Sequence, residues 1–254
     1  MRLNLRKLVC HSIVAAGLAA ALVAPAAAQG NIRSVTFYTV KPDRIGDFMA
    51  EIKEYNAVLA KGGSAQYYSM WLSQTGPRTY ARAQYYKTWA EMDAGADPKM
   101  KDEAADIARI SLRITECTES WHRVIEEVNP DLSLPDSGKV PDMLRVLVTE
   151  VRADKVGDYL ALVKSDILPG VKKSGAKDYS IAMGRFGESS SVVTSVLGFD
   201  KWADLDGAIG VEKALNKEAY QAFLSKLRPL IVSSQFDIYR FQPDLSYLPA
   251  ATAK

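Results

Sequence analysis

Alternating and helical patterns of apolar residues follow one another twice along this chain. Residues 35–40 are β-branched and aromatic and therefore predict a strand. An apolar stripe with spacings of three and four then runs from Ile45 to Leu59, which predicts an amphipathic helix that ends at Gly62-Gly63. The same reasoning gives the remaining elements of the first part: strands at residues 66–72, 78–86 and 120–128, and a helix after Pro98 that carries Ile107, Ile110 and Ile114.

The second part of the chain repeats this order of elements. Strands are expected at residues 144–151, 177–183, 191–199 and 232–241. One helix carries Val156, Tyr159, Val163 and Ile167, and a second carries Ala219, Phe223, Leu227 and Leu230. Pro169-Gly170 is expected to bend or end the first of these helices, because proline lacks a backbone donor.

Three short phrases occur twice in the same sequence order. Asp43-Arg44-Ile45-Gly46-Asp47-Phe48 returns as Asp154-Lys155-Val156-Gly157-Asp158-Tyr159, with Asp43 and Asp154 as the expected helix caps. The stretch that begins Thr88-Trp89 returns at Lys201-Trp202, and Pro130-Asp131-Leu132-Ser133 returns at Pro243-Asp244-Leu245-Ser246. Three ordered anchors at nearly one displacement indicate an internal duplication.

Each half therefore has the order βαββαβ, which is typical of the α+β ferredoxin-like fold. Right-handed crossovers place both helices of such a unit on one face of its antiparallel sheet and leave the other face open. Because an exposed apolar sheet face is rarely tolerated, we expect the two sheets to pack together, with the helices outside. The expected boundaries are 29–135 for the first repeat, 136–142 for a linker rich in Pro, Asp, Ser and Gly, and 143–254 for the second repeat with its extended tail.

This order of elements, with the paired helix starts and with Trp89 and Trp202 after the third strands, resembles the dimeric α/β-barrel superfamily. The resemblance implies a barrel made from two ferredoxin-like units, here fused in one chain. That group includes cofactor-free monooxygenases, haem-binding chlorite-dismutase-like enzymes and stress-response barrels. The resemblance concerns architecture, and no catalytic motif of the group can be placed on these residues.

The N-terminus has the pattern of a secretory signal peptide. Basic Arg2, Arg6 and Lys7 precede an apolar run that ends in Ala26-Ala27-Ala28, a typical small-residue cleavage site. We therefore expect residues 1–28 to be removed and the mature protein to be periplasmic or secreted, with no membrane span left.

Charge and cysteine content narrow the function classes further. Residues 1–28 contain three basic and no acidic side chains, so their removal takes the formal net charge from +2 to −1. A near-neutral chain lacks the basic surface of a nucleic-acid binder. The mature chain keeps one cysteine, Cys117, which excludes an internal disulfide and is expected to be a buried apolar residue.

The candidate ligand-binding residues come from a difference between the two halves. Tyr80, Arg82, Gln84 and Tyr86 share one face of the third strand, whereas the positions 113 residues later are Val193, Ser195, Leu197 and Phe199. Tyr67 and Trp71 share a face of the neighbouring strand. Such a polar and aromatic group suits a small-molecule pocket, in which Arg82 would pair with a carboxylate. The alternatives are a sheet face that meets solvent, or a salt bridge of Arg82 at the mouth of the barrel.

His122 is the one histidine that remains after residue 28, and it completes the candidate set. It is either an ordinary strand residue, an axial haem ligand or a general base, and we expect no resident cofactor. One histidine and one cysteine exclude the usual zinc patterns. The chain has no G-x-S-x-G hydrolase motif, and Glu126 and Glu127 point to opposite strand faces, which makes them poor candidates for a carboxylate pair.

Three functions remain open from the sequence. The first is an exported barrel that binds a small aromatic or carboxylate-bearing molecule. The second is a cofactor-independent monooxygenase-like enzyme that uses the same pocket. The third is a structural or interaction module with a solid core, and a cavity would separate it from the other two.

Overall fold

The computed structural model of the protein describes residues 30–93, 97–135, 137–208 and 210–249; the expected signal segment lies outside them. Its strands are β1 (Ile32–Val40), β2 (Tyr68–Ser73), β3 (Tyr80–Tyr86), β4 (Thr118–Val128), β5 (Met143–Val151), β6 (Tyr179–Phe186), β7 (Val192–Phe199) and β8 (Ile231–Phe241). Its helices are α1 (Ile45–Gly62), α2 (Ala104–Glu116), α3 (Val156–Leu162), α4 (Leu168–Lys173), α5 (Val211–Ala214) and α6 (Lys217–Leu227).

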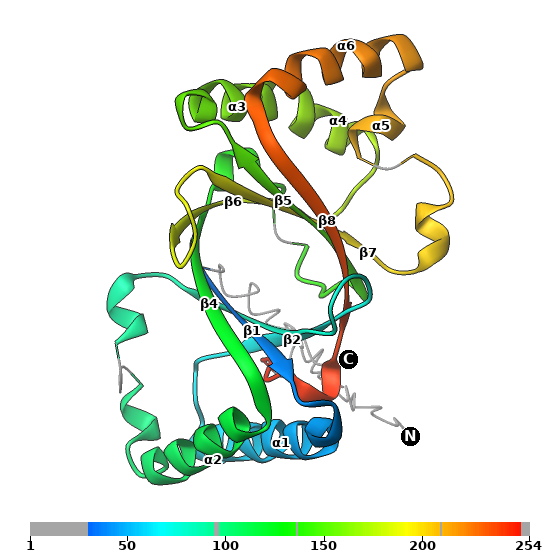
Figure 1. The fold of residues 1–254 in the computed structure, drawn as a ribbon. Helices are drawn as coiled ribbons and strands as arrows, with labels where there is room; N and C mark the ends of the chain where they lie inside the picture. Colours follow the sequence, from blue (N-terminus) through cyan, green and yellow to red (C-terminus); the bar gives the residue numbers. More distant parts are fainter. Residues whose placement is uncertain (1–29, 94–96, 136, 209, 250–254) are drawn as a thin grey trace, which may run out of the picture.

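The eight strands form one closed antiparallel barrel in the order β1-β3-β2-β8-β5-β7-β6-β4 (Figure 1). β1 to β4 make one wall and β5 to β8 make the other. Two seams join the walls: β2 pairs with β8 from Trp71↔Phe241 to Ser73↔Tyr239, and β4 pairs with β6 around Glu126↔Gly184. The α+β class and the barrel expected from the sequence are confirmed.

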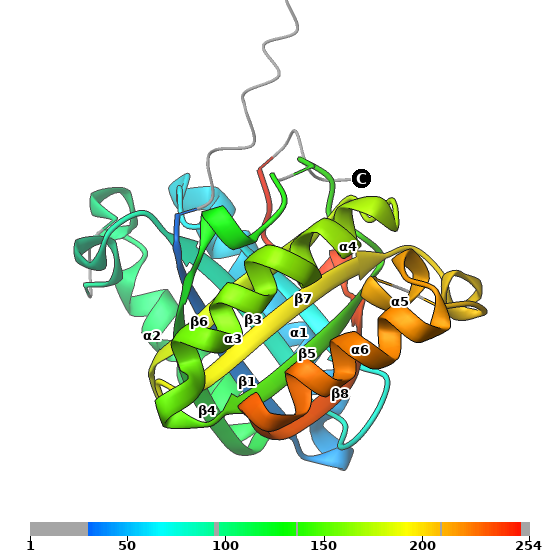
Figure 2. The same ribbon diagram turned by 90° about the horizontal axis from the view of Figure 1, so that it is seen from above.

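The helices lie in two layers on opposite sides of the barrel (Figures 1 and 2). α1 and α2 cover the outer face of the β1–β4 wall, and α3 to α6 cover the outer face of the β5–β8 wall. Each layer is held by an apolar cluster shared with the sheet beneath it. Members of the first cluster are Phe48, Ile52, Met70, Tyr80 and Ile110, and members of the second are Tyr159, Val163, Ile181 and Val193.

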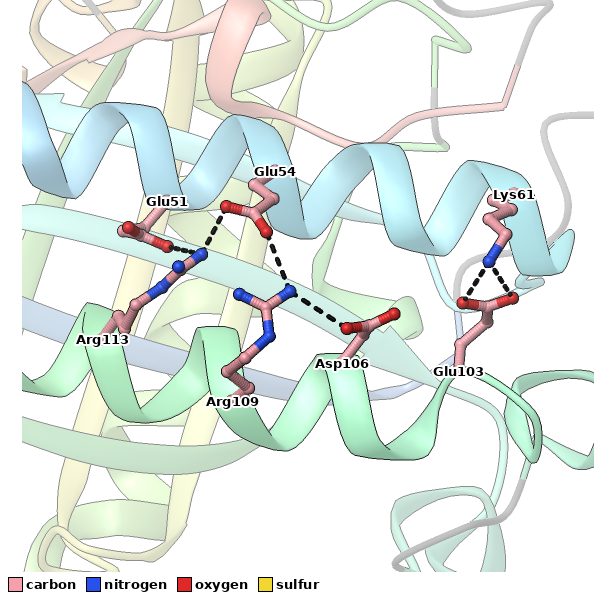
Figure 3. Close-up of polar contacts among 7 residues, drawn as sticks. All are labelled: Glu51, Glu54, Lys61, Glu103, Asp106, Arg109 and Arg113. Atoms are coloured by element: carbon pink, nitrogen blue, oxygen red, sulfur yellow. Dashed lines mark hydrogen bonds and ion pairs between the residues drawn. The ribbon is translucent and has the colours of Figure 1, made fainter.

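A row of ion pairs links α1 to α2 at the surface (Figure 3). Arg113 reaches Glu51 at 2.7 Å and also pairs with Glu54, while Arg109 reaches Glu54 at 3.0 Å. Lys61 and Glu103 close the far end of the row. Exposed pairs of this kind contribute about 1 kcal/mol or less each, so the attachment of the two helices to the sheet depends mainly on the buried apolar cluster.

The C-terminus of α1 agrees with the expectation from the sequence, whereas the N-terminal caps of α1 and α3 do not. α1 ends at Gly62, and Gly63 adopts φ +66°, as the paired glycines predicted. Asp43 and Asp154, however, do not cap α1 and α3, since both lie within short 3-10 turns that precede these helices. The second aspartates of the repeated phrase, Asp47 and Asp158, instead pair with Arg44 at 2.6 Å and Lys155 at 3.1 Å.

Pro169 does not end its helix. α3 passes into a π-helical turn at residues 163–167 and continues as α4 to Lys173. The wider turn accommodates a proline whose backbone cannot donate to the preceding turn.

Each of the repeated phrases has the same local structure in both places. Trp89–Met92 and Trp202–Leu205 are 3-10 turns, and so are Pro130–Leu132 and Pro243–Leu245. Leu132 and Leu245 are both buried at the end of these turns.

Two further expectations concern membrane contact and the cysteine. Within the described ranges, no helix has the length and apolar character needed to cross a membrane. Cys117 is a free, buried thiol, as expected, and its burial raises its pKa.

Candidate functional site

The space between the two walls is a cavity of about 1560 Å³. The interior of an eight-stranded barrel is ordinarily just wide enough to be filled by its own side chains. Here many inward positions carry small residues, among them Ser69, Ala81, Ala83, Ser180 and Gly198. The interior is therefore hollow, with room for a ligand of ordinary size.

Most of the cavity wall is apolar. Trp71 contacts Phe241 across the β2–β8 seam, with ring centroids 5.1 Å apart, and Phe37 stacks on His122 at 4.8 Å. Aliphatic side chains cover most of the remaining wall: Val35, Val124, Val128, Leu144, Val146, Val148, Val192 and Val196.

A buried ion pair interrupts this apolar surface. Arg33 on β1 lies opposite Tyr85 of β3 on one side and opposite Glu126 of β4 on the other, and all three line the cavity. The Arg33 Nε donates to Glu126 Oε2 at 2.7 Å, and both side chains are less than 5% exposed (4% and 3%). Arg33 Nη1 donates to the Ser180 hydroxyl at 3.3 Å.

The second terminal nitrogen of Arg33, Nη2, is less well satisfied. It is buried and makes no well-formed hydrogen bond within the described part of the chain, although the Tyr85 hydroxyl lies close enough to the guanidinium to interact with it. Burial alone would lower the pKa of Arg33, but Glu126 and Tyr85 together raise it above the ordinary value, so the guanidinium stays charged. A buried donor left in this state costs about 1–3 kcal/mol, which a suitable ligand oxygen would recover.

Glu188 brings a second carboxyl group toward the pair. It stands in the turn between β6 and β7, beside Gly184, where a Cβ would lie 2.7 Å from the Ser189 carbonyl oxygen. The glycine therefore allows the turn to fold close over β6. Burial raises the pKa of Glu188, and the negative charge of Glu126 raises it further.

The structure divides the residues predicted from the sequence between the two faces of the wall. Trp71 is opposite Ala81 in the β2–β3 register, whereas Met70 is opposite Arg82 and Leu72 is opposite Tyr80. Since opposite residues point to the same side, Trp71 cannot share a face with Arg82. Tyr67, Trp71 and His122 line the cavity, while Tyr80, Arg82 and Gln84 lie on the helix-covered face. Tyr86 borders the cavity at the end of β3, but its side chain interacts with Arg82 on the helix-covered side, so the seven residues do not form one pocket.

Arg82 has a different environment from the one expected. Its guanidinium lies over the Tyr68 ring at 4.1 Å and the Tyr55 ring at 5.3 Å, and its Nη2 donates to Gln84 Oε1 at 3.3 Å. Its contacts are thus the cation–π and hydrogen-bond contacts of a residue held between sheet and helix. A ligand-binding role for Arg82 stays a prediction.

The residues that the sequence did not reveal are Arg33 and Glu126. The expectation that Glu126 and Glu127 point to opposite faces is confirmed, because Glu126 is buried and Glu127 pairs with Arg185 at the surface. The partner of Glu126 is 93 positions earlier, across a register that residue patterns do not specify. A signal was present in the sequence, since the positions 111 and 113 residues after Arg33 and Glu126 are Leu144 and Tyr239, which carry no charge.

Comparisons with known proteins agree with this architecture. No family model matches the chain, and no curated protein matches it. Among solved structures, a putative monooxygenase from Lactobacillus acidophilus NCFM superposes with a TM-score of 0.58 at 9% identity, covering 88% of this chain and 97% of that one. The dimeric α/β-barrel proteins share this closed antiparallel barrel with helices outside it.

This chain has the dimeric α/β-barrel fold. A putative monooxygenase from Fusobacterium nucleatum subsp. nucleatum ATCC 25586 gives a TM-score of 0.56 at 11% identity, covering 83% of this chain and 91% of the other. An anthrone oxidase-like protein gives 0.53 at 14% identity, covering 88% and 96%. At these identities, the likeness establishes the fold and leaves the activity of this dimeric α/β barrel to its own residues.

Haem fits this barrel poorly. His122 faces the cavity and offers a nitrogen, but no hydrogen-bond acceptor orients its ring among the described residues; its ring contact is with Phe37. The lining also carries seven acidic side chains and three basic ones (Arg33, Lys87 and Lys139), which opposes the propionates of haem. We therefore derive no chemistry through haem.

Removal of one partner of the buried pair should lower the free energy of unfolding far more than removal of both. Arg33→Ala leaves the Glu126 carboxylate buried without a counter-ion and should lower the free energy of unfolding by about 3–5 kcal/mol. The double variant Arg33→Met/Glu126→Leu replaces the pair by apolar side chains and should be no less stable than the native protein. Urea denaturation at pH 7 measures both. If both variants lost the same free energy of unfolding, the pair would have to be hydrated in solution.

Proposed function

We propose that the barrel cavity binds a small, mainly apolar molecule, with its polar group placed against Arg33. The observation that carries this proposal is the Nη2 of Arg33, which is buried without a well-formed hydrogen bond in the mainly apolar cavity wall. Ligand pockets typically combine apolar walls with a few polar groups that fix orientation. The sequence-based expectation of an aromatic or carboxylate-bearing ligand thus moves from Arg82 to Arg33.

The energetics of the pair support a binding role over a structural one. A buried ion pair adds little stability compared with apolar residues of the same size. A solid core would place uncharged side chains at these positions, as the second half does with Leu144 and Tyr239. The cavity and its ion pair therefore argue against the third function considered above, a module with a filled barrel.

A bulky side chain inside the cavity should block binding. The probe is prodan, a neutral naphthyl ketone whose fluorescence shifts in apolar surroundings. Val146→Trp places an indole in the cavity and should weaken prodan binding by about tenfold or more, because the ring occupies ligand space. Val232→Trp adds the same ring at a side chain that is 62% exposed and should leave binding unchanged. Equal affinity in all three proteins would refute binding in the barrel.

A second candidate is a cofactor-independent monooxygenase-like activity. It is favoured by Glu188, a carboxyl group of raised pKa that lines the cavity and could accept a proton from an activated C–H group. Structural neighbours are described as putative monooxygenases and as anthrone oxidase-like. The corresponding reaction converts anthrone and dioxygen into anthraquinone and water.

Dioxygen uptake with anthrone tests this second candidate. If the reaction occurs in the cavity, uptake should match anthraquinone formation one to one and should be lost in Glu188→Gln. Loss in Arg82→Ala with retention in Glu188→Gln would locate the reaction beneath α1 instead. Binding of anthrone without uptake would leave the binding function alone.

We also propose that the barrel consists of two ferredoxin-like repeats, residues 29–135 and 143–254, joined by a linker at 136–142. The order of strands and helices in each part supports this division, as does the matching local structure of the repeated phrases. Fusion would supply from one chain the two walls that a barrel of this kind needs.

Export is part of the proposal. Residues 1–28 have the composition of a signal peptide, and the described remainder stands as a closed barrel without them. Protein recovered outside the cytoplasm should begin at Gln29 by N-terminal sequencing. Ala28→Arg should prevent this processing, since the cleavage site requires small residues. Recovery of the full-length chain from the cytoplasm alone would refute export.

A further inference from the structure

We propose that the cavity selects ligands with an uncharged acceptor oxygen, such as an aryl ketone, and excludes carboxylates of the same shape. This inference rests on the proposed binding function and names the class of ligand. Its basis is the internal neutralisation of Arg33 by Glu126 within the cavity wall.

The first argument is the hydrogen-bonding capacity left on Arg33. Nε is used by Glu126 and Nη1 by Ser180, so the donor without a well-formed hydrogen bond is Nη2, which a ligand oxygen would take over from the nearby Tyr85 hydroxyl. A ketone oxygen accepts such a hydrogen bond without bringing a charge into the cavity. The Tyr239 hydroxyl, on the opposite wall, is also a neutral donor, because burial and then Asp237 raise the pKa of Tyr239 to about 12.

The second argument is the absence of net positive charge beside that donor. The charge of Arg33 is already balanced at 2.7 Å by Glu126, and Glu188 adds another acidic group on the same side. Acidic side chains outnumber basic ones in the lining by seven to three. A carboxylate placed beside Arg33 loses its hydration and meets a cation that Glu126 already balances, which is the situation that buried anions avoid.

The pKa of Glu188 indicates that this environment disfavours the ionised form of an additional carboxyl group. Its ionisation is opposed by burial and by Glu126, so its pKa lies above the ordinary value. A ligand carboxylate beside Arg33 would meet the same two effects. A ketone would meet neither, because it carries no charge to desolvate.

Two probes with the same ring system test the selectivity. Prodan is the neutral ketone, and dimethylaminonaphthoic acid presents a carboxylate at the corresponding place. Fluorescence titration of the full mature protein at pH 7 should give an affinity for prodan that is higher by on the order of tenfold or more, the factor equivalent to one pKa unit of electrostatic penalty. Val146→Trp should weaken both probes if they share the cavity.

Removal of the internal counter-ion should largely abolish the preference. In Glu126→Gln, Arg33 is left uncompensated, so the naphthoate should bind on the order of tenfold more tightly than it does to the native protein. The double variant Arg33→Met/Glu126→Leu provides a second test if Glu126→Gln fails to fold. It removes the donor and both charges, so prodan should lose affinity while the naphthoate gains none.

The outcomes separate this inference from the function on which it rests. Naphthoate binding as tight as prodan binding in the native protein, blocked by Val146→Trp, would overturn the selectivity and leave the binding function intact. Unchanged selectivity in the double variant would also overturn it, because the pair would not be the cause. Failure of both probes to bind would count against the proposed function itself.

Discussion

The two seams that join β2 to β8 and β4 to β6 are the constraint on which the rest of this structure depends. Without them, each four-stranded wall would present two unpaired edges and an uncovered inner face. Backbone pairing at Trp71↔Phe241 and Glu126↔Gly184 turns both walls into one barrel. The inner faces then enclose a volume, and the size of the inward side chains decides whether that volume is filled.

Both the hollow interior and its polarity follow from residues on that inner face. Ala81, Ala83 and Gly198 leave space that larger residues would occupy. Arg33 and Glu126 then bring charge to one wall, where the other wall has Leu144 and Tyr239. A buried pair is a weak source of stability, and its presence on one wall and not on the other is the physical reason to locate function there.

Much of the fold could be predicted from the sequence because it depends on local patterns. The apolar stripe from Ile45 to Leu59 and the glycines after it specify α1 with almost no outside information. The position of Arg82 could not be predicted in the same way. Alternation along β3 shows that Tyr80, Arg82 and Gln84 share a face, but the side that α1 covers is decided by tertiary packing, in which Tyr55 of α1 lies over Arg82. The Arg33–Glu126 pair was hidden for a related reason, since antiparallel register joins residues 93 positions apart.

The repeated Pro-Asp-Leu phrases are explained by the direction of the strands that precede them. In this barrel order, β4 and β8 run in the same direction, so the segments that follow them emerge at the same end of the cavity. Each begins with a 3-10 turn whose leucine, Leu132 or Leu245, is buried, which fixes the direction of the chain beyond it. Val140 from one segment and Leu248 from the other then pack on the inner cluster of Trp71, Ala81 and Phe241. The phrase is repeated because both segments cover one end of the same interior, a packing requirement that involves no chemistry at the phrase itself.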